Sequence, residues 1–296
     1  MQPECHVQVQ FHAPPAELRR YFTTFYLVEL TVAAGCRVTD HLHPEWANLR
    51  FVSGDLPDAE AHGGTVLSHT NFCVTGPSSH TVRVEQGSAR MWGIGLLPLG
   101  WARFVGVPAV QYADSVIDGN THPAFSAFTP LAATLFGAEP DPAAELARIS
   151  DHFLARPARE VPDEARILAI HGALIDPDLA TVSQLVERTG GSLRTIERAC
   201  ARAFGFSPKL LLRRQRFMRS LAQYLLDPSL KWIGAIDGQY HDQAQFVRDF
   251  KQFVGMSPRQ YAALDKPIIG AVMHARARFA GHAVQALDRP EGGAAR

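Results

Sequence analysis

The chain reads Phe204-Gly205-Phe206-Ser207-Pro208-Lys209 near its carboxyl end, and 50 residues later it reads Val254-Gly255-Met256-Ser257-Pro258-Arg259. The same offset aligns three further pairs upstream, namely Ser192 with Asp242, Ile196 with Phe246 and Arg198 with Arg248. Similarity at a fixed spacing indicates one structural unit that is used twice.

Each unit is predicted to be a short helix, a turn and a second helix that begins at an N-cap residue. Ser192 and Asp242 suit that position because their side-chain oxygens accept hydrogen bonds from the free N–H groups of a first helical turn. In the first unit, apolar residues flank the turn Gly190-Gly191 at helical spacing, at Val182, Leu185 and Val186 and then at Ile196, Ala199, Cys200 and Ala203. Two helices joined by a tight glycine turn are typical of a helix-turn-helix.

Positive charge is concentrated in the same part of the chain. Residues 181–261 contain thirteen Lys and Arg but six Asp and Glu, a net charge of +7. The whole chain has 29 residues of each sign, so the remainder carries −7. A basic module in a neutral protein indicates a polyanionic partner such as nucleic acid, whereas the alternative is a merely solvated face.

The repeat resembles the DNA-binding domain of the AraC/XylS family of bacterial transcription regulators. The resemblance rests on residues 192–198, on Gly205 through Lys209, on the run Tyr240-His241-Asp242-Gln243-Ala244-Gln245-Phe246-Val247-Arg248-Asp249-Phe250, and on Gly255-Met256-Ser257-Pro258. It covers about a third of the chain strongly and the amino-terminal part weakly. It implies seven helices, two helix-turn-helix units joined by a long helix, and insertion into two successive major grooves.

Two positions depart from the family pattern in the second unit. Gln239 stands where the family usually has glycine, and Gly234 stands where the family usually has an aliphatic core residue. A glycine inside a helix costs about 1 kcal/mol relative to alanine. We therefore expect the second unit to be less rigid than is usual in the family, and its base reading to be less precise.

The fold class expected for the whole chain is α+β. Short apolar or β-branched runs separated by turn residues predict a barrel or sandwich in the amino-terminal part, with strands at 25–31, 48–52, 70–75, 81–84 and 89–96 and a helix at 18–22 before them. This part loosely resembles the family's cupin-like sensor domains. The expected organisation is a sensor or dimerisation domain at 1–155, a linker at 156–163, the double helix-turn-helix domain at 164–264 and a partly disordered tail at 265–296, with a short helix at 268–279.

Helical spacing also predicts helices at 143–154, at 162–175 and, between the two units, at 209–226. The apolar stripe of the first could pair two subunits, or it could pack on the protein's own barrel. The arginines of the third, Arg213, Arg214, Arg216 and Arg219, are expected to form a solvated face.

The DNA-contacting residues expected on the two recognition helices lie near the amino ends of those helices. They are Ser192, Arg194, Thr195, Glu197, Arg198, Arg202, Gln243, Ala244, Gln245, Arg248 and Lys251. Arginine can bridge guanine O6 and N7, and glutamine can bridge adenine N6 and N7. Thr195 and Arg202 are expected nearer the phosphates, and the equivalent Arg198 and Arg248 could instead be phosphate contacts or salt-bridge partners.

His41, His43 and Glu45 form the one sequence cluster that could bind a metal, because alternate residues of a strand share a face. Pro44 interrupts that strand, so a polar loop at the barrel mouth is the preferred interpretation. No catalytic grouping or phosphate-binding loop stands out, and we expect no enzyme activity, metal or cofactor. The four cysteines lack metal spacing and are interpreted as reduced thiols, and no membrane span is expected.

The sequence thus predicts a cytoplasmic, sequence-specific transcription regulator that binds promoter DNA. RNA polymerase, a small effector in the amino-terminal domain and a second copy of the chain are the expected partners. The alternatives are a metal-dependent cupin-type enzyme with an accessory basic domain, and a regulator controlled only by protein partners.

Overall fold

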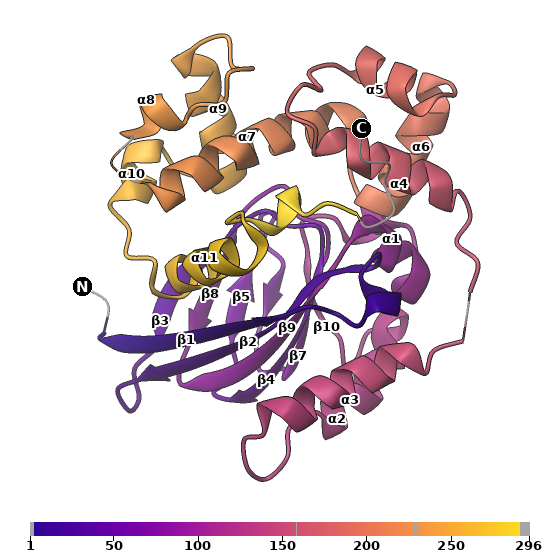
Figure 1. Cartoon of the computed structure of the whole chain (residues 1–296). Coiled ribbons are helices and arrows are strands. Elements are labelled where there is room, and N and C mark those ends of the chain that lie inside the picture. Colours follow the sequence, from indigo (N-terminus) through magenta and orange to yellow (C-terminus); the bar gives the residue numbers. More distant parts are fainter. Residues whose placement is uncertain (1–2, 158, 228, 230, 291–296) are drawn as a thin grey trace.

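The structure is a computed structural model and describes residues 3–157, 159–227, 229 and 231–290. The α+β prediction is confirmed: an antiparallel sheet-rich domain at residues 5–118, called the β domain below, precedes a helical region (Figure 1). The strands of the β domain are β1 Cys5–His12, β2 Phe22–Val32, β3 Val38–Leu42, β4 Asn48–Gly54, β5 Asp58–Glu60, β6 Val66–Leu67, β7 Phe72–Thr75, β8 Val82–Gln86, β9 Ala89–Leu96 and β10 Val116–Asp118.

The strands form two sheets that face each other. One has six strands in the order β1-β2-β9-β4-β7-β10, and the other has four in the order β3-β8-β5-β6. Each of the five predicted strands overlaps one of these, although β7 begins at Phe72 rather than at residue 70. The helix predicted at 18–22 is wrong: a 3-10 turn occupies Ala16–Leu18, and Phe22 already belongs to β2.

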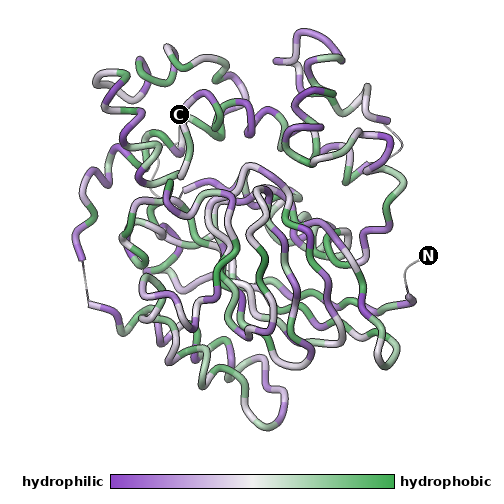
Figure 2. The backbone as a smooth tube through the Cα atoms, turned by 180° about the vertical axis from the view of Figure 1, so that it is seen from behind, coloured by the Kyte–Doolittle hydropathy of each residue, from purple (hydrophilic) through white to green (hydrophobic). Residues whose placement is uncertain are grey.

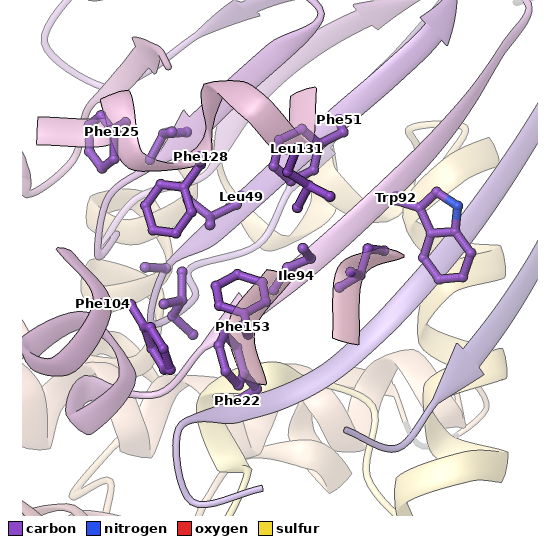
Figure 3. Close-up of a cluster of buried hydrophobic side chains, with 14 of the residues drawn as sticks. Phe22, Leu49, Phe51, Trp92, Ile94, Phe104, Phe125, Phe128, Leu131 and Phe153 are labelled. Carbon is purple, nitrogen blue, oxygen red and sulfur yellow. The ribbon is translucent and has the colours of Figure 1, made fainter. Parts of the chain in front are cut away.

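Helices cover the outer face of the larger sheet and bury its aromatic residues. They are η2 Trp101–Val105, η3 Ala109–Tyr112, η4 Pro123–Phe128, α2 Thr129–Thr134 and α3 Pro142–Leu154. The short helix α1, Pro98–Gly100, precedes them, and its Leu99 packs instead in the core of the helical region. Figure 3 shows Phe153 of α3 beside Phe22 and Ile94 of the sheet. The apolar stripe of α3 therefore packs on the protein's own β domain. Of the two alternatives given for this stripe, subunit pairing and packing within the chain, the structure shows the second.

A buried ion pair fastens α3 to the same sheet. The Glu145 carboxylate is fully buried and accepts hydrogen bonds from Arg90 Nη1 and Nη2 (2.8 and 3.0 Å) and from Trp92 Nε1 (2.7 Å). Loss of one partner would leave a buried charge without compensation, so this contact holds α3 in one place.

The described part of residues 164–264 contains seven helices, as the resemblance implied. They are α4 Glu164–Leu174, α5 Val182–Thr189, α6 Leu193–Phe204, α7 Pro208–Leu226, α8 Lys231–Ala235, α9 Gln243–Val254 and α10 Pro258–Ala262. The pairs α5–α6 and α8–α9 lie at the two ends of α7 (Figure 1). Hydrophobic and hydrophilic residues alternate along these helices, as Figure 2 shows.

The repeated sequence Gly-x-Ser-Pro has a direct structural reason. Gly205 and Gly255 end α6 and α9 in the left-handed conformation, with φ of 83° and 79°. That conformation favours glycine because a side chain would be strained there. Ser207 and Ser257 then cap α7 and α10, and a proline follows each in the first helical turn, where a missing N–H costs nothing.

The chain returns to the β domain after the second unit. Helix α11, Pro267–Ala280, and the 3-10 turn η6, Gln285–Leu287, lie between the sheets and α7 (Figure 1). The backbone N–H groups of Ile268 and Ile269 both donate to Asp40 Oδ2 (2.8 Å each). The helix expected at 268–279 thus corresponds to a covering element of the β domain, and the disorder expected for the last residues, 291–296, lies outside the described residues.

Candidate nucleic-acid interface

The exposed face of α6 carries three arginines in one stripe. Arg194, Arg198 and Arg202 are spaced four residues apart, so they lie on the same side of the helix. All three are exposed, and no ion-pair partner is present for them within residues 3–157, 159–227, 229 and 231–290. Arg198 could have been a phosphate contact or a salt-bridge partner instead of a base-reading residue. The salt bridge has no support within the described residues. The buried side of α6 consists of Ile196, Ala199, Cys200, Ala203 and Phe204.

The corresponding stripe of α9 is less basic. Ala244, Arg248 and Gln252 occupy the equivalent positions, and all are exposed. Arg248, like Arg198, lacks an ion-pair partner within the described residues. Gln252 is engaged within the domain, since its Oε1 accepts from Arg213 Nη2 (2.7 Å). The first unit therefore presents the stronger positive field to a polyanion.

The remaining predicted residues fall into two groups. Glu197, Gln243 and Lys251 are exposed on the two recognition helices, and their side chains make no hydrogen bond or ion pair within the described residues. Ser192 and Thr195 bond to each other (Oγ to Oγ1, 3.0 Å), and Ser192 Oγ also accepts from Thr195 N (3.2 Å). The Oε1 of Gln245 accepts from His241 N (3.1 Å). These last three side chains thus shape the helix amino ends.

The expectation of a solvated arginine face on α7 is wrong for most of its members. Asp249 of α9 is buried, and its two carboxylate oxygens accept from Arg213 (2.6 Å) and Arg216 (3.1 Å). Arg219 pairs with Asp237 (2.5 Å). Three arginines of α7 are thus paired with two carboxylates of the second unit, so they do not form a free basic face.

Arg214 is buried against the β domain. Its Nη1 donates to Ser78 O (2.9 Å) and Glu45 O (3.3 Å), and its guanidinium lies over the Trp46 ring. Burial lowers its pKa to about 9, which nearby Asp114 partly opposes, so it remains charged at neutral pH. The sequence pattern of α7 did not distinguish this arginine from its neighbours, because its contacts lie more than 130 residues away along the chain.

The two positions that depart from the family pattern, Gln239 and Gly234, have different surroundings. Gln239 does not adopt a positive φ, since the described non-glycine residues with one are His69, Asp114, Asp163 and Lys231. Its side chain donates to Pro177 O and accepts from Arg219 (3.3 Å), so it connects the second unit to the segment between α4 and α5. A looser second unit is therefore not supported at Gln239. Gly234 lies in the short helix α8 and is exposed.

Two of the three candidate metal ligands, His43 and Glu45, have protein partners, and the third, His41, is half-buried in β3. His43 Nε2 bonds to the Tyr261 hydroxyl (2.6 Å), and burial lowers the pKa of His43 to about 3. The Glu45 carboxylate pairs with Arg50 (2.7 Å). In the described residues, no three His, Cys, Asp or Glu side chains are grouped to hold a metal ion. His43 and Glu45 are thus both buried and engaged within the protein.

A cavity lies between the two sheets, and a second adjoins it beneath α11. Both are bordered by Leu42, Arg50, Met91 and Ile268. Burial opposes the charge of Arg50, but the adjacent Glu45 carboxylate outweighs it and raises the pKa of Arg50. This cation is thus neutralised by a protein partner, and the cavity walls are mostly apolar.

Residues 185–263 match the family model of a helix-turn-helix domain. This range begins in α5 and extends just past α10, so it contains both units. The class of protein that the domain defines is a DNA-binding transcription regulator. The predicted resemblance is confirmed at this level, because the matched domain is of the AraC type.

Solved structures with a similar course of the chain include two of ToxT. ToxT from Vibrio cholerae O395 is 9% identical over 87% of this chain and 96% of that chain, with a TM-score of 0.42. Unsaturated fatty acid-bound ToxT from V. cholerae strain SCE256 is 9% identical over 88% and 96%, with a TM-score of 0.41. The AraC-like transcriptional activator CuxR is 15% identical over 73% and 87%, with a TM-score of 0.27.

No curated protein matches the chain. Across the described residues, none of the helices has both the length and the apolar character that a membrane crossing requires.

Proposed function

We propose that the protein binds specific promoter sequences through α6 and α9 and regulates transcription there, with RNA polymerase as its downstream partner. The observation that carries this proposal is the exposed arginine stripe at Arg194, Arg198 and Arg202, which follows a capped helix amino end. Arginine side chains near that end of a recognition helix reach base edges, and those further along reach phosphates. A homodimer, bound through the β domain, is the proposed assembly.

In vitro selection from a random duplex library tests the proposal with the full chain. Wild-type protein is expected to enrich a sequence motif, and the double variant R194A/R198A is expected to lose about 1–3 kcal/mol per arginine on it. Arg188→Ala is the matched control, because it removes an exposed arginine that pairs with Asp176. Wild-type protein that enriches no motif would contradict sequence-specific binding.

The cavity supports an effector rather than control by protein partners alone. Its walls are mostly apolar and its one central cation, Arg50, is already paired with Glu45, so an uncharged and largely apolar small molecule fits it. Nile red, an uncharged apolar dye, is a suitable probe for the full chain.

Two tryptophan variants of β8 make the dye experiment specific. Val84 lines the cavity and Arg83 points to the other face of the same strand. Val84→Trp is expected to abolish most of the dye fluorescence, whereas Arg83→Trp is expected to leave it unchanged. Equal loss in both variants, or no binding by wild type, would favour a regulator without a small ligand.

A further inference from the structure

One short loop of the β domain touches both helix-turn-helix units. It is the β7–β8 loop, residues 76–81, which joins the ends of β7 and β8. At the first unit it meets the end of α6: a Cβ added to Gly205 would lie 3.1 Å from Pro77 Cβ. At the second unit it meets the end of α9, where Thr81 N donates to Phe253 O (2.9 Å) and Thr81 Oγ1 donates to Val254 O (3.3 Å).

These contacts fall at equivalent places of the repeat. The 50-residue offset aligns Phe204 with Val254 and Gly205 with Gly255. The loop therefore meets the carboxyl-terminal end of each recognition helix, and it leaves the amino-terminal ends, with Arg194 and Gln243, exposed. Between the two units, Ser78 O accepts from Arg214 at the middle of α7 (2.9 Å).

The loop is also rigid, because the β domain holds it from the other side. The carboxylate of Asp114 accepts from Ser79 N (2.6 Å), Ser79 Oγ (2.8 Å) and His80 N (3.1 Å), and Asp114 N donates to Pro77 O (2.9 Å). Ser78 N donates to Glu45 O (3.0 Å). Residues 76–79 are buried. A loop fixed in this way can hold the two helix-turn-helix units at a constant distance and orientation relative to each other.

We propose that the β7–β8 loop is a positioning element that fixes the placement of α6 relative to α9, and thereby the spacing between the two DNA half-sites that the protein accepts. The inference rests on the proposed DNA binding, and it adds that half-site spacing is set by the β domain as well as by α7. Asp114 is then a positioning residue, because it touches neither helix-turn-helix unit through a hydrogen bond and acts through the loop.

The experiment is a selection from random duplexes by the full chain, in which the distance between the two enriched half-site motifs is measured. Wild-type protein is expected to give one dominant spacing. Asp114→Gly tolerates the positive φ of 53° at this position but removes the carboxylate, and it is expected to enrich the same two motifs at several spacings. Its affinity for the wild-type site should fall 5- to 10-fold, with no change on a duplex that holds one half-site.

Conservative and matched variants separate positioning from general damage to the fold. Asp114→Asn keeps an acceptor for the two backbone N–H groups and is expected to restore the single spacing. Asp118→Ala removes a carboxylate from the nearby β10, whose partners are Thr70, Asn120 and Thr121, and is expected to behave as wild type. Thr81→Val, which removes the bond to Val254 O, should broaden the spacing even if Asp114→Gly does not fold.

The outcomes are distinguishable. A single unchanged spacing in both Asp114→Gly and Thr81→Val would overturn the inference while leaving DNA binding intact. Tighter binding by these variants would also overturn it, since the loop would then restrain the units from DNA. A wild-type selection without any motif would overturn the proposed DNA binding itself, and the inference with it.

Discussion

The guanidinium carbon of Arg214 lies 4.1 Å from the centre of the Trp46 ring, so that the middle of the long helix α7 is anchored on the β domain by a cation on an aromatic face. Both side chains are buried, and Arg214 Nε and Nη2 have no hydrogen-bond partner in the described structure. A buried charge is costly unless it is compensated. The indole ring and the two carbonyl oxygens supply that compensation.

This contact predicts effects of different size for two substitutions. Trp46→Ala leaves a cavity beside an uncompensated cation and is expected to lower the free energy of unfolding by about 3–5 kcal/mol. Arg214→Met fills similar space without the unsatisfied donors and is expected to change it by less than about 1.5 kcal/mol. Urea denaturation of both variants is the measurement, and a larger loss for Arg214→Met than for Trp46→Ala would show that the charge itself is stabilising.

The two ends of the α6 arginine stripe are expected to contact different parts of the DNA: Arg194 the bases and Arg202 the phosphates. Arg194→Ala should cost about 1–3 kcal/mol on the selected site and relax preference at one or two base pairs. Arg202→Ala should weaken selected and scrambled duplexes alike and reduce the slope of log K against log salt by about one unit. Titrations of both duplexes over a salt series test this, and equal losses for Arg194→Ala on both would make it a phosphate contact.

Gln239 is expected to stabilise the helical region. Restoring the family's glycine there removes the bonds to Pro177 O and Arg219 and adds backbone freedom, so Gln239→Gly should lower the free energy of unfolding by about 1–2 kcal/mol. Gln239→Glu is an informative companion, since it can still accept from Arg219 but cannot donate to Pro177 O. A rise in the melting temperature of Gln239→Gly would contradict the contact described for this turn.

Stability is expected to fall as the pH is lowered below neutrality. Burial lowers the pKa of His43 to about 3 and, partly opposed by Asp288, lowers that of His171 to about 4. The unfolded chain, with a histidine pKa of about 6.5, therefore binds more protons between about pH 4 and 6.5. The stabilisation is complete above pH 6.5 and is lost by about 1.4 kcal/mol per pH unit per histidine as the pH falls through that range.

Unfolding midpoints at pH 7.0, 6.0 and 5.0 measure this dependence. The variant His171→Phe, whose ring can keep the contacts with Trp46 and Phe204, should show a shallower decline than wild type. The exposed His274 provides the control, because His274→Gln should leave the slope unchanged. Identical slopes for all three proteins would mean that His171 is protonated in the folded state.

The two hydrogen bonds that Asp40 accepts from the amino end of α11 are expected to contribute measurably to the free energy of unfolding. Asp40→Ala removes the acceptor of the Ile268 and Ile269 N–H groups and should cost about 1–3 kcal/mol. Asp40→Asn keeps one acceptor and should cost less. Hydrogen exchange at these two amides, followed by mass spectrometry, should accelerate in Asp40→Ala first, and unchanged exchange would show that α11 is held by its apolar side alone.

Much of the helical region could be predicted because its signals are local. A glycine that ends one helix and a Ser-Pro pair that begins the next are readable within six residues, and they occur twice, at 205–208 and 255–258. The order and type of elements from α4 to α10 follow from these signals and from apolar spacing. The exposure of Arg194 and Arg248 follows for the same reason, because the opposite side of each helix is apolar.

The remaining features depend on partners that are remote in the sequence. The arginines of α7 have the same local pattern, and only Asp249, Asp237 and the β domain determine which of them are paired. The short strands β3, β5 and β6 depend on pairing across the smaller sheet rather than on their own residues. The position of α11 against Asp40, more than 220 residues earlier, could not be inferred from its composition.

The arrangement of α11 also has a consequence for how the protein is made. The β domain is synthesised first, but the helix that covers its cavity emerges from the ribosome only after roughly 150 more residues, which takes about 7–30 s at a translation rate of 5–20 residues per second. During that interval the helix-turn-helix units can fold while the cavity lacks its cover. Completion of the sheet domain is therefore the last step of its biogenesis rather than the first.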